Sequence, residues 1–133
     1  MFKLKYELFG EHLITISFDT DYSFIKEAQT YDYIKNRLPY WKVERIDTTD
    51  QRGFPDLLCK RGPLYMQIEC KLLKKKKLYE LKQDLEWQFG QIAYLKKALA
   101  RGEPSVICVA KDKTIAFIGP FKTIKRLAEE LKI

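Results

Sequence analysis

Two apolar runs separated by Arg61-Gly62-Pro63 constrain the fold of this chain more than any other feature of its sequence. The runs cover residues 55–60 and 64–71, and turn-forming residues between two such runs predict an antiparallel β-hairpin. Side chains alternate between the two faces of a strand. Alternate residues of the second run form an apolar face that we expect in the core: Leu64, Met66, Ile68 and Cys70. The residues between them form a more polar face: Tyr65, Gln67, Glu69 and Lys71.

Strands and helices follow one another irregularly along the rest of the sequence. Apolar–polar alternation predicts strands over residues 2–9, 12–18, 41–47, 105–110 and 114–118, with the last two forming a hairpin. Helical periodicity predicts helices over residues 24–38, 83–100 and 121–131, the first capped by Asp21 or Ser23 and the second ended by Gly102. This order predicts a mixed α/β fold rather than repeated βαβ units. The 133 residues fit one domain, with an N-terminal hairpin over 1–22, a core over 23–110 and a C-terminal strand and helix over 111–133.

The charge and the cysteines indicate the partners and the environment of the chain. Its net charge of +7 favours polyanions, nucleic acid above all, although a generic basic surface explains the charge equally well. Cys59, Cys70 and Cys108 lie in apolar runs without metal-ligand spacing, which indicates buried thiols in a reducing compartment. The sequence has a single histidine, His12, so histidine-based triads and zinc clusters are poorly supported. No stretch approaches the ~18 apolar residues of a membrane span, and we expect a cytoplasmic protein without a membrane partner.

Three ionisable side chains are expected to meet at one end of the central hairpin. Glu69 and Lys71 lie on the same face of its second strand, about 6–7 Å apart along the strand. If the hairpin turns at residues 61–63, Asp56 falls opposite Glu69. Two facing carboxylates repel each other unless a cation lies between them, and their hard oxygen atoms suit Mg²⁺ or Mn²⁺. The alternative is a solvent-exposed ion pair between Glu69 and Lys71, worth about 0–1 kcal/mol.

Polar residues on the apolar stripes of two predicted helices are candidates for the same site. Glu27 falls inside the stripe of the first helix, where an unpaired carboxylate is unfavourable. It either joins the site or extends to solvent near the helix N-terminus. In the long helix, Gln88 lies inside the core stripe and Gln91 at its edge. A buried amide needs hydrogen-bond partners, which either a functional site or a nearby strand backbone supplies.

These residues resemble the signature of the PD-(D/E)XK nuclease superfamily, which is an acid on a first helix followed by P-D and then E-x-K. Here the corresponding residues are Glu27, Pro55-Asp56 and Glu69-Cys70-Lys71. The stretch from Gln91 to Leu95, with Gly102 after it, resembles the Q-x-x-W-L…G helix of the virus-type replication-repair nucleases (VRR-NUC). Residues 52–57 resemble the R-x-G-x-P-D-L segment of that family, which is related to the Holliday-junction resolvases. The chain departs from the pattern with Tyr94 in place of Trp and with a lysine-rich segment directly after the E-x-K motif.

The resemblance covers residues 24–110 and implies a restriction-endonuclease-like αβββαβ core, to which this chain adds an N-terminal hairpin and a C-terminal helix. It also implies roles for single residues. Asp56, Glu69 and the backbone carbonyl of Cys70 would bind Mg²⁺ or Mn²⁺, and Glu27 would bind a second ion or a metal-bound water. Lys71 would orient or activate water, and Gln91, or Gln88 in its place, would position Lys71 or the phosphate.

The activity implied by the resemblance is metal-assisted hydrolysis of DNA phosphodiester bonds. The expected enzyme is a structure-directed endonuclease of viral or mobile-element replication, recombination or repair, located in the host cytoplasm if viral. Nucleases of this kind often act as homodimers on branched DNA. A basic rim beside the acids is expected to bind the phosphates of branched or duplex DNA without reading its sequence: Arg52, Lys60, Arg61, Lys74, Lys75, Lys76 and Lys77.

Three alternatives to these interpretations stay open. A solvated charged loop explains any single lysine of the rim as well as a phosphate contact does. The chain could be a catalytically silent nucleic-acid-binding module on the same fold, such as a viral protein that blocks a host enzyme. It could also be a structural domain whose basic face binds an acidic protein.

Overall fold

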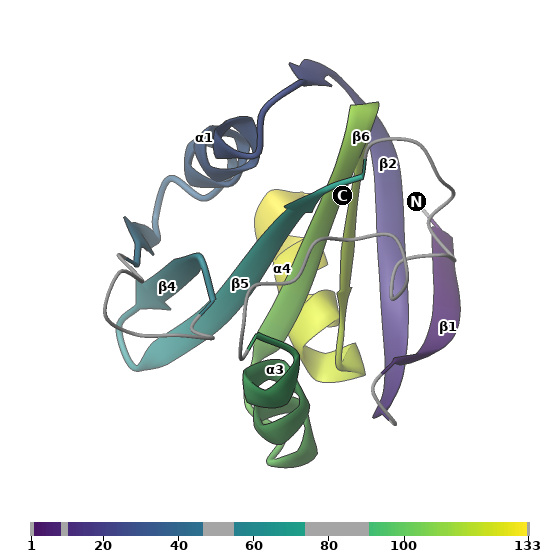
Figure 1. Cartoon of the computed structure of the whole chain (residues 1–133). Helices are drawn as coiled ribbons and strands as arrows, with labels where there is room; N and C mark the ends of the chain where they lie inside the picture. Colours follow the sequence, from purple (N-terminus) through teal and green to yellow (C-terminus); the bar gives the residue numbers. More distant parts are fainter. Residues whose placement is uncertain (1, 9–10, 47–54, 74–90, 133) are drawn as a thin grey trace.

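The computed structural model describes residues 2–8, 11–46, 55–73 and 91–132 of the chain (Figure 1). These residues form one six-stranded sheet in the order β1-β2-β6-β5-β4-β3, together with three helices. The strands are β1 (Phe2–Leu8), β2 (Glu11–Phe24), β3 (Lys42–Arg45), β4 (Leu57–Arg61), β5 (Leu64–Leu72) and β6 (Ser105–Gly119). The helices are α1 (Ala28–Arg37), α3 (Gln91–Ala100) and α4 (Phe121–Leu131). The mixed α/β class predicted from the sequence is confirmed.

β4 and β5 form the antiparallel hairpin that was predicted around residues 61–63. Leu57 pairs with Ile68 and Arg61 pairs with Leu64. Gly62 turns the chain with a φ of +59°, a left-handed conformation that glycine adopts without steric strain. β3 pairs with β4 on one side of the hairpin, and the start of β6 pairs in parallel with β5 on the other. β5 is therefore a central strand of the sheet.

β6 is a continuous extended run that folds back on itself. A straight strand of 15 residues spans about 50 Å. The carbonyl oxygen of Ser105, however, lies only 2.9 Å from the position that a Cβ atom on Gly119 would occupy. Asp112, between these ends, has a φ of 53°, and the first half of β6 pairs with β5 while the second half pairs with β2. The hairpin predicted around residues 111–113 is therefore present, and it places the parallel and antiparallel parts of the sheet side by side.

The first helix begins later than the sequence predicts. β2 continues to Phe24, and α1 begins only at Ala28, with Glu27 at its N-cap. Asp21 and Ser23 lie within β2, so the predicted caps are wrong. Because the helix starts at residue 28 rather than 24, Glu27 lies at the helix end and not inside an apolar stripe.

A turn closed by a side chain explains this late start. The side-chain oxygen of Gln29 accepts hydrogen bonds from the backbone N–H groups of Ile25 and Lys26, at 2.6 and 2.8 Å. These N–H groups are thus satisfied outside the helix. Phe24 is buried in either arrangement, because as the last residue of β2 its ring packs on Tyr33 with the ring centroids 5.6 Å apart. Burial of Phe24 therefore gave an apolar stripe that extended the predicted helix too far.

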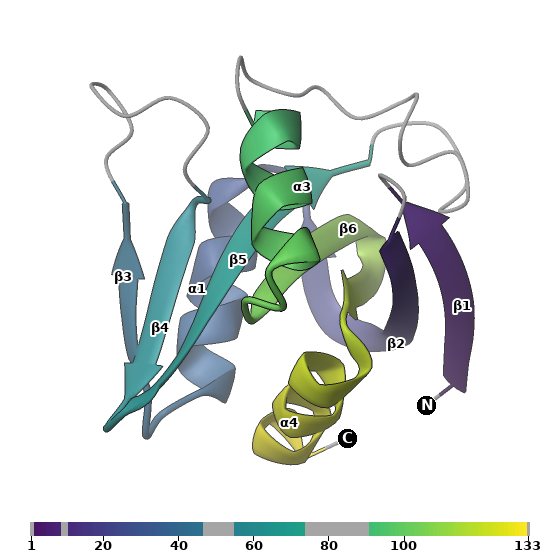
Figure 2. The same ribbon diagram turned by 90° about the horizontal axis from the view of Figure 1, so that it is seen from below.

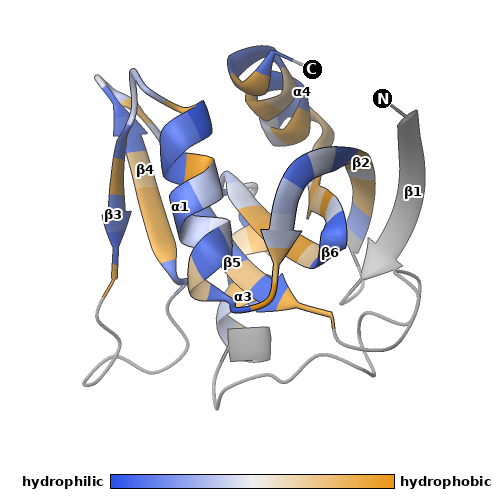
Figure 3. Cartoon of the chain, turned by 90° about the horizontal axis from the view of Figure 1, so that it is seen from above, coloured by the Kyte–Doolittle hydropathy of each residue, from blue (hydrophilic) through white to orange (hydrophobic). Residues whose placement is uncertain are grey.

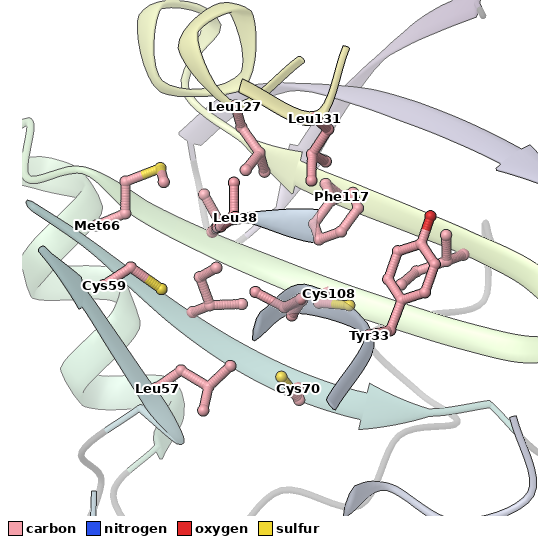
Figure 4. Close-up of a cluster of buried hydrophobic side chains, with 14 of the residues drawn as sticks. Tyr33, Leu38, Leu57, Cys59, Met66, Cys70, Cys108, Phe117, Leu127 and Leu131 are labelled. Atoms are coloured by element: carbon pink, nitrogen blue, oxygen red, sulfur yellow. The ribbon is translucent and has the colours of Figure 1, made fainter. Parts of the chain in front are cut away.

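Two hydrophobic clusters lie on opposite faces of the sheet. The larger cluster lies between the sheet and the helices α1 and α4 (Figures 2 and 4). It includes three of the four residues predicted for the apolar face of β5, namely Met66, Ile68 and Cys70. The fourth, Leu64, directly follows the turn and is 37% exposed, so its predicted place in the core was wrong. The smaller cluster lies beneath α3, where Leu95 and Leu99 contact residues of β2 and β6. Figure 3 shows the corresponding hydrophobic and hydrophilic sides of α4 and the hydrophobic character of most of β4. The three cysteines are buried and free, as predicted.

The ends of the last two helices agree with the sequence. Gly102 follows α3 with a φ of +73°; its N–H donates to the carbonyl of Leu99, and the N–H of Glu103 donates to that of Ala98. This pattern is a Schellman motif, which ends a helix at a glycine. The predicted part of the long helix over residues 83–90 lies outside the described residues. α4 has the predicted bounds, with Pro120 at its N-cap, and no helix in the described part of the chain is long and apolar enough to cross a membrane.

Candidate active site

Asp56 lies immediately before β4, and its carboxylate accepts a hydrogen bond from the backbone of β5. The side-chain Oδ2 atom accepts the backbone N–H of Cys70 at 2.9 Å. The pairing of Leu57 with Ile68, continued by one residue, places Asp56 opposite Glu69. β4 begins after Asp56, so the carboxylate satisfies an N–H of β5 that no strand of the described residues pairs with at this level. The register that the sequence predicts for the two acids is therefore present.

Glu69 and Lys71 form an ion pair that is buried and not exposed. Their side chains lie on the face of β5 opposite the larger hydrophobic cluster, and Glu69 is 1% and Lys71 5% exposed. The Nζ atom of Lys71 lies 3.1 Å from Oε2 of Glu69. A buried pair of this kind has a large desolvation penalty, whereas an exposed pair has almost none. The alternative of a solvent-exposed ion pair is therefore wrong.

Glu27 approaches the same group from the N-terminus of α1. The side chain is half-buried, and its Oε1 atom accepts a hydrogen bond from the hydroxyl of Tyr31 at 3.2 Å. Burial raises the pKa of Glu27, the negative charge of Asp56 raises it further, and the positive charge of Lys71 lowers it. Glu27 therefore lies within the electrostatic reach of both residues. The alternative in which it simply extends to solvent does not describe it.

The three carboxyl groups destabilise one another as anions. Burial, followed by the charge of Asp56, raises the pKa of Glu69 to about 8, although the charge of Lys71 lowers it. Burial also raises the pKa of Asp56, against the hydrogen bond from the Cys70 N–H and the charge of Lys71. Burial and like charge both disfavour the ionised form of an acid. A cation bound among the three carboxylates would therefore relieve a repulsion that is already present.

Tyr31 and Arg45 belong to the site although the sequence did not indicate them. The Tyr31 hydroxyl donates to Glu27, and hydrogen bonding from Tyr31 also lowers the pKa of Asp56. The guanidinium carbon of Arg45, on β3, lies 5.0 Å from the centre of the Tyr31 ring, and its charge lowers the pKa of both Glu27 and Asp56. Tyr31 follows Glu27 by four residues, which places the two on one side of a helix. That spacing is the signal that the sequence offered for Tyr31.

The backbone of Cys70 directs its polar groups toward Asp56. Along β5, the N–H of Gln67 donates to the carbonyl of Pro104 and the N–H of Leu73 to that of Ala110, so odd-numbered residues bond toward β6. Even-numbered residues therefore bond toward β4, and in a strand the N–H and C=O of one residue point to the same side. The carbonyl oxygen of Cys70 thus lies on the side of Asp56, beyond the end of β4.

The oxygen atoms of this site suit a hard divalent cation by their chemistry but are not arranged around one. Carboxylate and carbonyl oxygens are the ligands that Mg²⁺ and Mn²⁺ prefer. Among the described residues, no three or more His, Cys, Asp or Glu side chains are grouped so as to hold a metal ion. A metal ion would therefore require the carboxylates of Asp56, Glu69 and Glu27 to move toward one another.

The other predicted site residues are distributed over different parts of the molecule. Lys60 is exposed on the same face of the hairpin as Asp56, since the two are four residues apart. Arg61 lies on the opposite face, where its Nη1 atom contacts both carboxylate oxygens of Glu130 at 3.0 Å. The structure describes the backbone of Gln91 as the first residue of α3 but not its side chain. Three further predictions lie outside the described residues: Arg52, Gln88 and the run from Lys74 to Lys77.

Comparison of the chain with known proteins gives no relative to guide the assignment. No protein-family model matches it, and no curated protein or solved structure matches it either.

Proposed function

We propose that the chain is a metal-dependent nuclease that hydrolyses phosphodiester bonds of DNA. One observation carries the proposal: the fold brings Glu27, Asp56, Glu69 and Lys71 from three separate segments into one electrostatically coupled group. Three acids and a lysine at one end of a hairpin suit metal-assisted hydrolysis, in which acids hold the ion and an amine holds water or phosphate. The net charge of +7 favours a polyanionic substrate.

The proposal includes a finer description of the fold. From α1 to β6, the elements of the described residues follow the order helix, three antiparallel strands, helix, and a strand whose first half is parallel to the third of these. This order supports a restriction-endonuclease-like αβββαβ core, with β1 and β2 at one edge and α4 as additions. It also supports the resemblance to the PD-(D/E)XK superfamily, because the acids lie at the start of α1, directly before β4 and on β5.

Each residue of the group has a proposed role. Asp56, Glu69 and the Cys70 carbonyl would hold a Mg²⁺ or Mn²⁺ ion, and Glu27 would hold a second ion or a water bound to the first. A divalent ion, when bound, lowers the pKa of its water and stabilises the charge that develops on the phosphate. Lys71 holds the attacking water or the phosphate. Arg45, which is exposed beside Tyr31, provides a positive charge at the edge of the site. Gln91 remains a proposed positioning residue.

The experiment is a cleavage assay on four DNA substrates: plasmid, linear duplex, flap and four-way junction. We expect cleavage with Mg²⁺ or Mn²⁺ and none with EDTA. Asp56→Ala, Glu69→Ala and Lys71→Ala should each abolish cleavage while the fold is kept. Glu27→Gln should lower activity more than stability, because the amide keeps the shape of the side chain but removes its charge. Circular dichroism and thermal unfolding report on the fold of each variant.

A matched control separates the loss of a site charge from the loss of any carboxylate. Glu129 is exposed on α4, which packs on the other face of the sheet from Glu69. Glu129→Gln should cleave DNA like the wild type. Full activity in a folded Asp56→Ala, Glu69→Ala or Lys71→Ala protein would refute the assignment of the site.

A second function is favoured by one specific observation. Lys71 pairs with Glu69, and burial raises the pKa of Glu69 to about 8, so the group can be close to neutral without a metal ion. A catalytically silent nucleic-acid-binding module, or one that blocks a host enzyme, would need no more than this. The same assay distinguishes the two functions, because the silent module binds DNA but gives no cleavage with either metal.

A further inference from the structure

The face of the β4–β5 hairpin that carries the acids continues into a cavity of about 420 Å³. On this face, Leu58 is paired with Gln67 and Lys60 with Tyr65, and all four residues line the cavity. The pair formed by Asp56 and Glu69 comes one step earlier along the same face. Successive pairs on one face of a hairpin are separated by about 6.6–6.8 Å. A ligand group in the cavity therefore lies close enough to the acids to belong to the same bound molecule.

A buried amide with a fixed orientation lies in the wall of this cavity. Gln67 is 8% exposed, its Oε1 atom accepts a hydrogen bond from the Tyr94 hydroxyl at 2.8 Å, and its Nε2 atom donates to Glu103 at 3.3 Å. Glu103 is itself held by Arg101 at 3.1 Å. A carboxylate only accepts hydrogen bonds, so the contact with Glu103 fixes which end of the amide is nitrogen. Beyond these two bonds, the amide has a second N–H and a second oxygen lone pair, a donor and an acceptor side by side.

The remaining walls combine an aromatic surface with a positive charge. Tyr65 is 42% exposed, so its ring is available to a ligand. Tyr94 from α3 also lines the cavity. Lys60 is exposed on β4 and pairs with Tyr65 across the hairpin. Nucleobases stack on aromatic side chains and are read by paired donors and acceptors, while lysine binds the neighbouring phosphates. A base enters a cavity of this kind only when it is unpaired and unstacked.

We propose that this cavity binds one unpaired nucleobase of a DNA strand whose backbone runs past Asp56 and Glu69. Tyr65 stacks on the base, Gln67 forms hydrogen bonds with its edge, and Lys60 contacts the adjacent phosphate. The inference rests on the proposed function, because it takes the acid group as the place of cleavage. It narrows the substrate to DNA that has an unpaired nucleotide beside the scissile bond, as flaps, gaps and junctions do.

The test measures binding in EDTA, so that the DNA stays intact, by fluorescence anisotropy on three labelled DNAs. These are a full duplex, the same duplex with a single-stranded flap, and that flap with abasic sites in place of its bases. Stacking of one base is worth about a 5- to 150-fold change in affinity. Tyr65→Ala should therefore weaken binding to the normal flap by about tenfold and leave duplex binding within about twofold. The abasic flap should bind the wild type as weakly as the normal flap binds Tyr65→Ala, with no further loss in the variant.

Two variants control for other effects. Tyr40→Ala removes a more exposed tyrosine, 76% exposed, that contacts Arg61 on the other face of the hairpin, and it should bind every DNA like the wild type. Gln67→Leu keeps the volume of the side chain but removes its donor and acceptor, and it should reduce the preference among the four bases in the flap. Thermal unfolding identifies any variant that has lost its fold, and Tyr65→Phe, which keeps the ring, should then retain wild-type affinity.

The outcomes separate this inference from the proposed nuclease activity. If Tyr65→Ala weakens binding to normal and abasic flaps equally, no base occupies the cavity and the inference is overturned, even where cleavage persists. A dimer in sedimentation that Tyr65→Ala dissociates would assign the cavity to a second copy of the chain and would also overturn it. Base-dependent binding without metal-dependent cleavage would refute the nuclease and leave the cavity assignment standing. Absence of binding to all three DNAs would overturn both.

Discussion

The two faces of β5 are buried almost equally and carry opposite chemistry. Met66, Ile68 and Cys70 are 0% exposed on one face, and Gln67, Glu69 and Lys71 are 8%, 1% and 5% exposed on the other. Burial of apolar surface stabilises a fold by about 25 cal/mol per Å². A buried ion pair contributes little and is often replaced by apolar residues without loss. The apolar face therefore explains why the hairpin folds, whereas the polar face points to a use other than stability.

The polar face is tolerated because its groups are satisfied by neighbours from several elements. Asp56 accepts the Cys70 N–H, Glu69 pairs with Lys71, Glu27 accepts from Tyr31, and Gln67 lies between Tyr94 and Glu103. Each hydrogen bond offsets part of the desolvation of the groups that it joins. Even so, the pKa values of the three acids remain raised, so the compensation is incomplete. The predictions below test whether the two faces can be changed independently.

The largest effect is expected on the polar face, from Glu69→Gln. Removal of the charge that holds a metal ion should lower the rate of cleavage by about 10²–10⁴-fold, the usual range for a group acting on the reacting atoms. The amide can still accept a hydrogen bond from Lys71, so the melting temperature should stay the same or rise. Single-turnover cleavage and thermal unfolding measure the two quantities, with Glu129→Gln as the control. A variant that loses stability but keeps its rate would assign the polar face to folding.

The opposite pattern is expected from Ile68→Ala on the apolar face. Deleting a fully buried isoleucine side chain should lower the free energy of unfolding by about 2–5 kcal/mol, from lost transfer energy and the cavity left behind. Urea unfolding should show a lower midpoint with an unchanged m-value. Cleavage per folded molecule should equal that of the wild type at a temperature where the variant is folded. A loss of rate without a loss of stability would mean that the two faces are not independent.

The alternation of residues along β5 predicted the apolar face and the polar face, but it did not predict how deeply the polar face is buried. Side-chain parity and the turn at Gly62 gave the apolar face, the polar face and the register of Asp56 with Glu69, because all three follow from local geometry. The burial of the polar face depends on more than β5 itself: for example, Tyr94 of α3, from a distant part of the sequence, donates a hydrogen bond to Gln67. The participation of Arg45 likewise depends on β3 lying next to β4. Contacts between separate segments carry no local sequence period, so single-residue patterns missed them.

The predicted start of α1 was wrong for a related reason. Phe24 satisfies the helical apolar stripe and the strand equally well, since it is buried in both. The side chain of Gln29, which closes the turn before the helix, decided between them. Ser, Asp and Asn are the usual signals for the start of a helix, whereas here a glutamine side chain that accepts from the preceding backbone sets the start.

The next largest effect is a dependence of stability on pH that arises from Glu69. Its pKa is about 8 in the folded protein and close to its usual value of 4.5 in the unfolded chain, so the folded state binds the proton more tightly. The free energy of unfolding is therefore highest below pH 4.5 for this group and falls as the pH rises to 8, by on the order of 5 kcal/mol. The pKa values of Glu27 and Asp56 are also raised, and they act in the same direction.

Urea unfolding at pH 5, 7 and 9 measures this dependence, and the difference between wild type and Glu69→Gln isolates the contribution of Glu69. The slope against pH should be smaller in the variant. Addition of Mg²⁺ should stabilise the wild type more at pH 9 than at pH 5, because an ion binds the deprotonated carboxylates. Equal slopes in the two proteins would show that Glu69 is not protonated in the folded state at neutral pH.

The smallest effect is expected from Tyr31→Phe, which removes the hydroxyl that donates to Glu27. The hydroxyl donates to Glu27 and its hydrogen bonding lowers the pKa of both Glu27 and Asp56, so its loss should raise both pKa values. One hydrogen bond contributes about 1 kcal/mol, so cleavage at neutral pH should fall by about fivefold. A purely structural role would lower stability without moving the pH profile. A positioning role would instead shift the rising limb of the rate against pH to higher pH, so that the variant approaches the wild-type rate in alkaline buffer. Tyr33→Phe removes a hydroxyl from the same helix on the side of the larger hydrophobic cluster, and its pH profile should match that of the wild type. If Tyr31→Phe and Tyr33→Phe have the same dependence of rate on pH, Tyr31 contributes to the packing of α1 and not to the candidate site.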